Sequence, residues 1–402
     1  MNVTTEKPWR IFLIFLRLGL TSFGGPVAHL GYFRTEFVDR RKWLSDKEYG
    51  DLVALCHFLP GPASSQVGLA IGILKARYKG AFAAWFGFTM PSALMLILFS
   101  FGVAGTFGEA MSGAIAGLKV VAVAIVAHAV WGMARTLCRG VIEIALAMSS
   151  VCALLLFPGV LTQLIAILVA GVGGYFLIKR NIQGNDDEMS CSSFGVSSRA
   201  GVLWLAVFAI LLLLLPIASY LSQSAAISLF DDFYRVGSLV FGGGHVVLPL
   251  LEAEVVDTGL LSESAFLTGY GATQAVPGPL FTFAAYLGAL NTSPISGIVG
   301  AVVCLIAIFL PAFLLVAGSL PFLSHIRQSA KMQSALAGVN ASVVGILTAA
   351  LVDPLWPTAI LGLTEFTLAL LAFLALLVLR APSWLVVLAC STVGMFLLGV
   401  GG

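Results

Sequence analysis

The feature that most constrains this chain is an almost unbroken succession of apolar runs, each about 20 residues long. A helix needs a run of that length to cross ~30 Å of hydrocarbon. The strands of a transmembrane barrel would be about ten residues long and would alternate apolar with polar residues. Only 10% of the residues are charged and 59% are hydrophobic, far from the composition of a soluble domain. The sequence therefore predicts an all-α polytopic membrane protein.

The first apolar run belongs to the mature fold. It begins at Ile11 and is interrupted by Arg17, and no small-residue cleavage site follows it. A secretory signal peptide would have an uninterrupted apolar core and such a site. We therefore expect this run to be retained as structure.

The second half of the chain repeats the pattern of the first. Residues 17–30, RLGLTSFGGPVAHL, recur as residues 235–248, RVGSLVFGGGHVVL, and each copy is followed by a Pro-Gly-Pro, at residues 60–62 and 277–279. We expect an N-terminal repeat (1–178), a polar linker plus a connecting transmembrane helix (179–227, with the helix near 201–220), and a C-terminal repeat (228–402). Further matches in register are Glu36 with Glu254, Leu44-Ser45 with Leu261-Ser262, Gly80 with Gly297, Pro91 with Pro311, and Ala116-Gly117 with Ala337-Gly338.

The distribution of charged residues predicts the topology. If the Phe-Gly-Gly and Pro-Gly-Pro segments both spanned the membrane, the basic loop at residues 34–47 would lie outside, against the positive-inside rule. If both are re-entrant, that loop and the basic residues at 75–79 lie in the cytoplasm, and crossings follow near 81–104, 113–133, 141–157 and 160–178. The connecting helix then inverts the second repeat, and the acidic loop at 252–263 lies outside. We expect two inverted-topology repeats, although segments of this length also permit full crossings.

Each broken segment has the chemistry of an anion site. Arg17, Thr21 and Gly24 or Gly25 fall on one helical face, and the break at residues 23–26 frees backbone N–H groups at a new helix start. Helix N-termini carry a partial positive charge and unpaired donors, and two arginines add two full charges. The sum suits a divalent tetrahedral oxyanion. The candidate substrate-binding residues are Arg17, Thr21, Ser22, Phe23, Gly24, Gly25, Pro60, Gly61, Pro62, Ser64, Ser65, Gln66, Arg235, Phe241, Gly242, Gly243, Gly244, Gln274, Pro277, Gly278 and Pro279.

Structural alternatives exist for these residues. The glycines also fit close helix packing of the GxxxG type, as at Gly68/Gly72 and Gly113/Gly117. Arg17 lies six residues into its apolar run and could instead reach the membrane interface.

A few titratable residues are candidates for proton coupling. They are His57, Glu36, Glu254, His245 and Lys119. The alternatives are packed polar histidines, ion-paired loop glutamates, and, for Lys119, an interhelical hydrogen bond, since its repeat mate is Asn340.

Other functional classes are not supported. The chain contains no GxxxxGK[ST] nucleotide loop, GxSxG or HExxH motif, so we expect neither a primary pump nor an intramembrane enzyme. The six cysteines are scattered without CxxC spacing and fit core packing. We expect no catalytic residues, metal, cofactor or nucleic-acid partner. A passive anion channel and a structural scaffold are the competing hypotheses to a secondary transporter, which would bind its oxyanion between the two repeats.

Four segments resemble one known family. They are FGGPVAHLG at 23–31, DRRKWLSDKEYGDLVALCHFLPGPASSQVG at 39–68, FGGGHVVLP at 241–249 and TQAVPGPLFTFAAYLG at 273–288. Together they are similar to the CHR family of chromate ion transporters in its long, two-domain form. The resemblance implies an inner-membrane protein that moves chromate, with sulfate as its analogue, and expels chromate with the proton motive force, giving chromate resistance. His57 departs from the glutamine of the family pattern, which Gln274 keeps. The expected partners are the oxyanion, coupling protons, the lipid bilayer and a second copy in a homodimer.

Overall fold

The computed structural model describes residues 6–104, 112–178, 197–241, 244–322 and 329–398. These residues form helices joined by turns and short irregular segments, without a β-strand. The expectation of an all-α fold is therefore confirmed for the described residues. Five helices are long and apolar enough to cross a membrane. They are α4 (Ala63–Ala104), α5 (Ser112–Leu137), α8 (Ser198–Ser222), α13 (Gly297–Ser319) and α15 (Ala330–Ala350).

The remaining helices follow the same order in both halves. In the first half they are α1 (Pro8–Thr21), α2 (Gly25–Arg34), the π-helix η1 (Thr35–Arg40), α3 (Asp46–Phe58), α6 (Val141–Leu156) and α7 (Val160–Leu177). In the second half they are α9 (Ala225–Leu239), η4 (Gly244–Val246), α10 (Val247–Val255), α11 (Glu263–Ala275), η5 (Leu280–Thr282), α12 (Phe283–Leu290), η6 (Leu320–Phe322), η7 (Leu351–Leu355), α16 (Trp356–Ala359), α17 (Leu363–Leu377) and α18 (Ser383–Leu397). Helix α8 lies between the halves and is exposed along most of its length, as expected for an unpaired helix in lipid.

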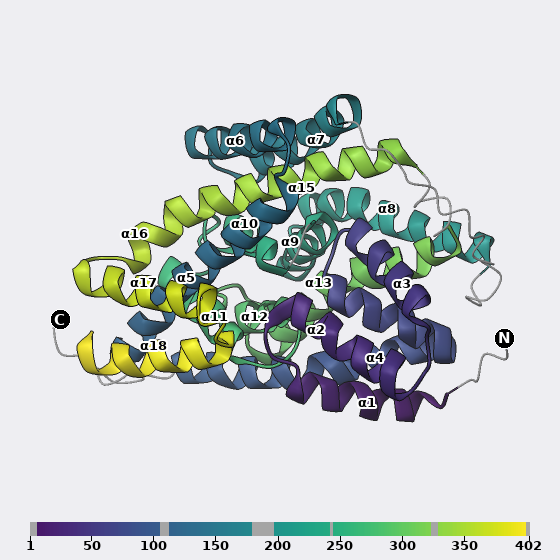
Figure 1. Cartoon of the computed structure of the whole chain (residues 1–402), viewed down its shortest axis with the longest axis horizontal. Helices are drawn as coiled ribbons and strands as arrows, with labels where there is room; N and C mark the ends of the chain where they lie inside the picture. Colours follow the sequence, from purple (N-terminus) through teal and green to yellow (C-terminus); the bar gives the residue numbers. More distant parts are fainter. Residues whose placement is uncertain (1–5, 105–111, 179–196, 242–243, 323–328, 399–402) are drawn as a thin grey trace.

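The first half begins with two helical hairpins. Phe33 of α2 packs edge-on against Phe15 of α1 and Phe37 of η1 stacks on it, so the chain folds back on α1 after the break. Helix α4 is interrupted by non-helical backbone at Ala76 and Arg77, so its first part also folds back on the rest. The pieces α1, α2, α3 and α4 gather at the end of the molecule that carries the N-terminus (Figure 1).

The same turn recurs in the second half with a longer connection. In α4 the backbones of Gly72 and Gly80 touch, because a Cβ on Gly72 would lie 2.4 Å from the Gly80 carbonyl oxygen. In the second half Gly288 and Gly300 make this contact across the α12–α13 turn, at 2.3 Å. Gly80 therefore corresponds in space to Gly300 and not to Gly297, which places the inserted residues within the turn itself.

The two halves interlock through their last helices. Helix α18 of the second half packs on α5 of the first, and α7 of the first half packs on α15 of the second (Figure 1). Glycines let these backbones touch: a Cβ on Gly117 would lie 2.2 Å from the Cys390 carbonyl oxygen, and one on Gly338 would lie 2.0 Å from that of Ala170. The GxxxG packing expected at Gly113/Gly117 is thus confirmed, and the repeats are not separate lobes.

The five cysteines that the structure describes form no disulfide with one another. Cys56, Cys304 and Cys390 are buried and reduced, as expected for core residues, whereas Cys152 is exposed. Cys191 lies outside the described residues.

Replacing Gly117 with alanine should destabilise the protein. The added methyl group would overlap the α18 backbone, and overpacking of this kind costs about 1–3 kcal/mol. Gly132→Ala is the matched control on the same helix, because no atom lies within 4 Å of its Cβ position. Alanine is the better helix former by about 1 kcal/mol, so this control should be neutral or stabilising. Thermal unfolding in detergent should separate the two variants, and equal melting temperatures would contradict the interlock.

Candidate functional site

The Phe-Gly-Gly segment of the first half separates two helices. Helix α1 ends at Thr21 and α2 begins at Gly25, with Gly24 (φ +99°) and Gly25 (φ +75°) in the left-handed region that favours glycine. In the second half α9 ends at Leu239, and α10 begins after the short helix η4. Gly242 and Gly243 lie outside the described residues. The broken helices expected from the glycines are present in the first half and consistent with the ends of α9 and α10.

Each Pro-Gly-Pro segment forms a tight reversal before a new helix. Gly61 (φ +121°) and Gly278 (φ +113°) hold backbone conformations that other residues rarely adopt. Helix α4 starts directly after Pro62, and its first turn carries Ser64, Ser65 and Gln66, all of them buried. In the second half the 3-10 helix η5 follows Pro279 and leads into α12.

The four breaks are joined by two crossed hydrogen bonds, which we call the crossed brace. Gly61 of the first half donates its N–H to the carbonyl of Val240, the residue that follows α9, at 2.6 Å. Gly278 of the second half donates to the carbonyl of Ser22, the residue that follows α1, at 3.0 Å. Gly244 also lies against Pro26, since its Cβ would be 3.1 Å from the proline ring. Both Pro-Gly-Pro reversals are therefore bound to the broken helix of the other half.

Three buried hydroxyl groups near the brace have no hydrogen-bond partner among the described residues. They belong to Ser22 at the end of α1, Ser65 in the first turn of α4, and Thr89 further along α4. Buried polar groups in proteins are almost always hydrogen-bonded, so unpaired ones call for an explanation. A polar ligand held among them would supply the missing partners.

His29 connects the break to the Pro-Gly-Pro reversal within the first half. Its ring is fully buried, with Nε2 3.2 Å from the Ser22 carbonyl oxygen, Nδ1 3.4 Å from the Ser64 Oγ, and the Phe88 ring edge-on at 5.2 Å. Sequence reasoning did not single out His29 or Thr89. It selected polar residues that recur in both repeats, and His29 has the apolar Val247 at the matching position of the second repeat.

The start of α18 covers the same region. The Trp384 ring lies 5.8 Å from the Phe23 ring, and the Ser383 hydroxyl donates to the carbonyl of Gln274 at 3.4 Å. Phe23 and Gln274 were both candidate residues, and this helix brings the two halves together around them. Phe241, the residue that matches Phe23 in the second repeat, is half-buried.

The two candidate arginines have different surroundings. Arg17 is exposed on α1, and no ion pair of its guanidinium is found among the described residues, while Thr21 donates to its carbonyl. Arg17 and Thr21 thus lie outside the buried hydroxyl cluster. Their assignment to the substrate site stays a prediction.

Arg235 is enclosed by carboxylates. It contacts Asp231 at 3.0 Å, Asp232 at 2.9 Å and Glu254 at 3.3 Å. The charge of Arg235 is thus offset by carboxylates, and its assignment to the substrate site stays a prediction. The physical reason for the difference from Arg17 is local, because α1 has Leu13 and Ile14 where α9 has the two aspartates.

The proposed proton carriers also differ from one another. Glu36 accepts from Arg40 at 3.0 Å and from Arg41 at 2.7 Å, which favours the ion-paired alternative. The His245 ring lies 2.8 Å from the Tyr270 hydroxyl, and Lys119 is within electrostatic reach of Glu263. His57 is exposed near the end of α3. A role in proton transfer stays a prediction for each.

Fold and site together define a multi-pass membrane protein made of two homologous, interlocked halves with paired broken helices. A family model described as chromate transporter matches residues 9–175 and 227–395. The chain belongs to the chromate transporter family, in the form that carries the family unit twice. It is therefore a transporter and not an enzyme.

Several curated relatives cover most of the chain. A chromate transport protein of Pseudomonas aeruginosa is 30% identical over 86% of this chain and 80% of the relative. A chromate transport protein of Cupriavidus metallidurans is 26% identical over 90% of this chain and 87% of the relative. An uncharacterized transporter of Methanocaldococcus jannaschii is 26% identical over 84% of this chain and 82% of the relative. No solved structure matches the chain.

Replacing Gly278 with alanine should disrupt the crossed brace. The new Cβ would lie 2.7 Å from the Ser92 hydroxyl at a φ of +113°, so steric overlap adds to backbone strain of about 1–3 kcal/mol. Gly259→Ala is the control, because it also has a positive φ (+76°) but open space around its Cβ position. We expect Gly278→Ala to lower the melting temperature clearly more than Gly259→Ala does. A similar loss in both variants would show that only backbone strain matters.

Replacing Arg235 with alanine should destabilise the protein, whereas Arg17→Ala should not. The first change leaves three carboxylates without their cation, and breaking a buried pair costs about 3–5 kcal/mol. We expect the lower end of that range, because the Arg235 side chain is 26% exposed. Adding Asp232→Asn to Arg235→Ala should restore part of the lost melting temperature. An unchanged melting temperature in Arg235→Ala would argue against the carboxylate enclosure.

Proposed function

We propose that the protein is a secondary active transporter of tetrahedral divalent oxyanions, with chromate as substrate and sulfate as its analogue. The observation that carries this proposal is the set of unpaired buried hydroxyls of Ser22, Ser65 and Thr89 beside the crossed brace. Two half-helices, α2 and α4, begin there, and their N-termini favour an anion. Hydroxyl donors and helix N-termini together can replace the hydration shell of a dianion without a metal ion.

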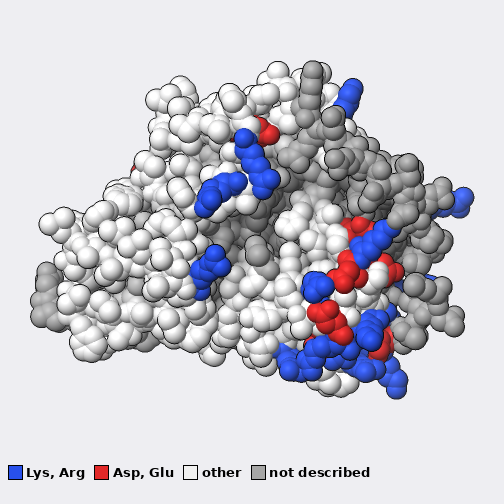
Figure 2. Space-filling view, in the orientation of Figure 1, with Lys and Arg blue, Asp and Glu red and all other residues white. Residues whose placement is uncertain are grey.

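The inverted arrangement is part of the proposal. The start of α1, the segment after η1 and the bend in α4 meet at one end: Glu6 donates its N–H to the Lys75 carbonyl, and the Lys75 ammonium lies 5.6 Å from the Trp43 ring centre. This contact supports re-entrant hairpins that enter and leave on one side. Charged side chains gather at that end, whereas the opposite end of this face is almost free of them (Figure 2). The positive-inside rule supports a cytoplasmic location for this end. We propose that the membrane is the inner membrane, as the family resemblance implies.

The asymmetry between the arginines supports alternating access. Arg17 in the first half is exposed, while Arg235 in the second half is enclosed by three carboxylates. In a transporter of inverted repeats, one half-site faces one side of the membrane while the other half-site is closed. We infer that the proton motive force drives export, which would give chromate resistance, and that the protein forms a homodimer.

The hydroxyls should matter for transport but not for stability. Ser22→Ala together with Ser65→Ala removes two donors that have no protein partner to lose, so the melting temperature should stay unchanged. A hydrogen bond to a charged group contributes about 1.5–3 kcal/mol, so loss of oxyanion affinity should be roughly tenfold or more. Uptake of labelled sulfate into proteoliposomes, with chromate as competitor, measures this loss.

The control is Ser100→Ala on the same helix α4. Its hydroxyl donates to the Ile97 carbonyl and lies outside the site, so transport should be retained.

An imposed pH gradient should stimulate net uptake by the unmodified protein, which separates a coupled transporter from a passive channel. If the unmodified protein moves neither anion, the proposed function is wrong.

A further inference from the structure

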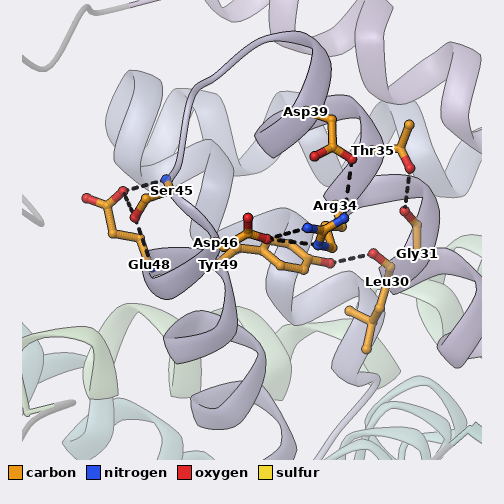
Figure 3. Close-up of polar contacts among 9 residues, drawn as sticks. All are labelled: Leu30, Gly31, Arg34, Thr35, Asp39, Ser45, Asp46, Glu48 and Tyr49. Atoms are coloured by element: carbon orange, nitrogen blue, oxygen red, sulfur yellow. Dashed lines mark hydrogen bonds and ion pairs between the residues drawn. The ribbon is translucent and has the colours of Figure 1, made fainter.

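The first half of the chain balances Arg34 with two carboxylates. Arg34 donates from Nε to Asp46 at 2.9 Å and from a terminal nitrogen to Asp39 at 3.3 Å (Figure 3). The hydrogen bond with Asp46 raises the pKa of the Arg34 guanidinium. All three side chains are about half exposed, and together they hold the loop between α2 and α3.

The second half keeps the two acids of this cluster but replaces its cation. In the register that matches Glu36 with Glu254, Arg34 corresponds to Glu252 and Asp39 to Asp257. In the register that matches the helix-capping serines, Ser45 and Ser262, Asp46 corresponds to Glu263. A surface cluster of one cation and two carboxylates in one half is therefore an all-acid cluster in the other.

Glu252 is buried and incompletely bonded. Its residue is 5% exposed, and its Oε1 has no hydrogen-bond partner among the described residues. It lines a cavity of about 190 Å³ between α10 and α7, together with Gln163, Asp257 and Asp353. Gln163 is 7% exposed, and its Oε1 is also unpartnered, while its Nε2 donates to the Pro249 carbonyl at 3.3 Å. Two buried oxygen acceptors thus line one cavity without a donor.

The charged groups around Glu252 are acidic on every side that the structure describes. Asp257 comes from the loop after α10, Asp353 from η7 and Glu263 from α11. Helix α7 contributes the neutral Gln163, and α15 lines the cavity with apolar residues only. Two cations on neighbouring helices interact with other carboxylates. Arg235 of α9 forms ion pairs with Asp231, Asp232 and Glu254. Lys119 of α5 interacts electrostatically with Glu263.

A buried carboxylate facing other carboxylates must take up a positive charge. An unpaired buried charge costs several kcal/mol, and carboxylates that share a site usually retain a proton. No group of three acidic, histidine or cysteine residues in the described part of the chain is arranged to hold a metal ion. A proton on Glu252 would also supply the cavity with the donor that Gln163 Oε1 lacks.

We propose that Glu252 is the residue that takes up the coupling proton, from the face of the molecule where Asp257 and Asp353 are exposed. The inference rests on the proposed function. The proton binds Oε1 of Glu252 as an O–H group and leaves as H⁺ to water when α10 moves. Because α10 follows the second break and the short helix η4, and α7 comes from the other half, protonation lets α10 pack on α7. Deprotonation repels α10 from the surrounding acids.

Glu252→Gln, which mimics the protonated form, tests this proposal in proteoliposomes. Exchange of labelled sulfate across the membrane needs no net proton movement and should continue in the variant. Stimulation of net uptake by an imposed pH gradient should be lost. Glu365→Gln at the start of α17, outside the cavity, is the matched control and should behave like the unmodified protein.

The outcomes separate the two proposals. If the unmodified protein shows no sulfate exchange, the proposed function fails. If exchange occurs and Glu252→Gln keeps its full response to the pH gradient, or if a sodium gradient replaces the pH gradient in the unmodified protein, the assignment of a proton to Glu252 is overturned.

A second measurement does not depend on transport. Infrared spectra of the purified protein should contain a protonated-carboxyl stretching band that Glu252→Gln removes and Glu252→Asp retains at a shifted frequency. The same band in unmodified and Glu252→Gln protein would overturn the proposal even if the variant were inactive.

Discussion

The structure depends on finding hydrogen-bond partners for the backbone N–H and C=O groups at its helix breaks, where lipid excludes water. Helix breaks in hydrocarbon leave N–H and C=O groups that only protein or a water-filled cavity can pair. Here Gly61 and Gly278 supply the missing partners, each donating to the residue that follows a broken helix in the opposite half. The hydrogen bonds that make the breaks tolerable therefore also hold the two halves in register. A site at these breaks therefore lies between the repeats, because each break is hydrogen-bonded to the opposite half.

The interlocked helices give this centre a fixed frame. Helix α5 packs on α18 and α15 packs on α7 through glycines whose backbones touch, so each half is completed by the other. Such contacts have no space for even one added methyl group, and close packing of this kind resists independent movement. The helices that precede the breaks pack in the same way, since a Cβ on Gly87 would lie 2.6 Å from the Phe12 carbonyl oxygen and one on Gly237 would lie 2.2 Å from that of Ile308.

Much of this architecture could be predicted from residue pattern alone. The apolar runs predicted the helices, and the duplicated Phe-Gly-Gly and Pro-Gly-Pro segments predicted where helices break, because glycine and proline act on their own backbone. The surroundings of Arg235 and Glu252 could not be predicted in the same way. A repeat alignment assumes equal environments, whereas Arg235 has Asp231 and Asp232 on its own helix where the first repeat has apolar residues. Glu252 faces Asp353, which comes from a distant segment that the alignment does not bring beside it.

The sequence by itself determined the membrane class, the two repeats, the position of every break and the family. These properties follow from local hydropathy and backbone chemistry, which neighbouring residues decide. Only the tertiary structure decided that the repeats exchange their last helices, that His29 joins a break to a reversal, and that one arginine is enclosed while its mate is exposed. The exchange of the last helices depends on contacts between segments more than a hundred residues apart. The surroundings of His29 and of Arg235 depend on shorter-range contacts, in which the packing of side chains determines which polar groups meet.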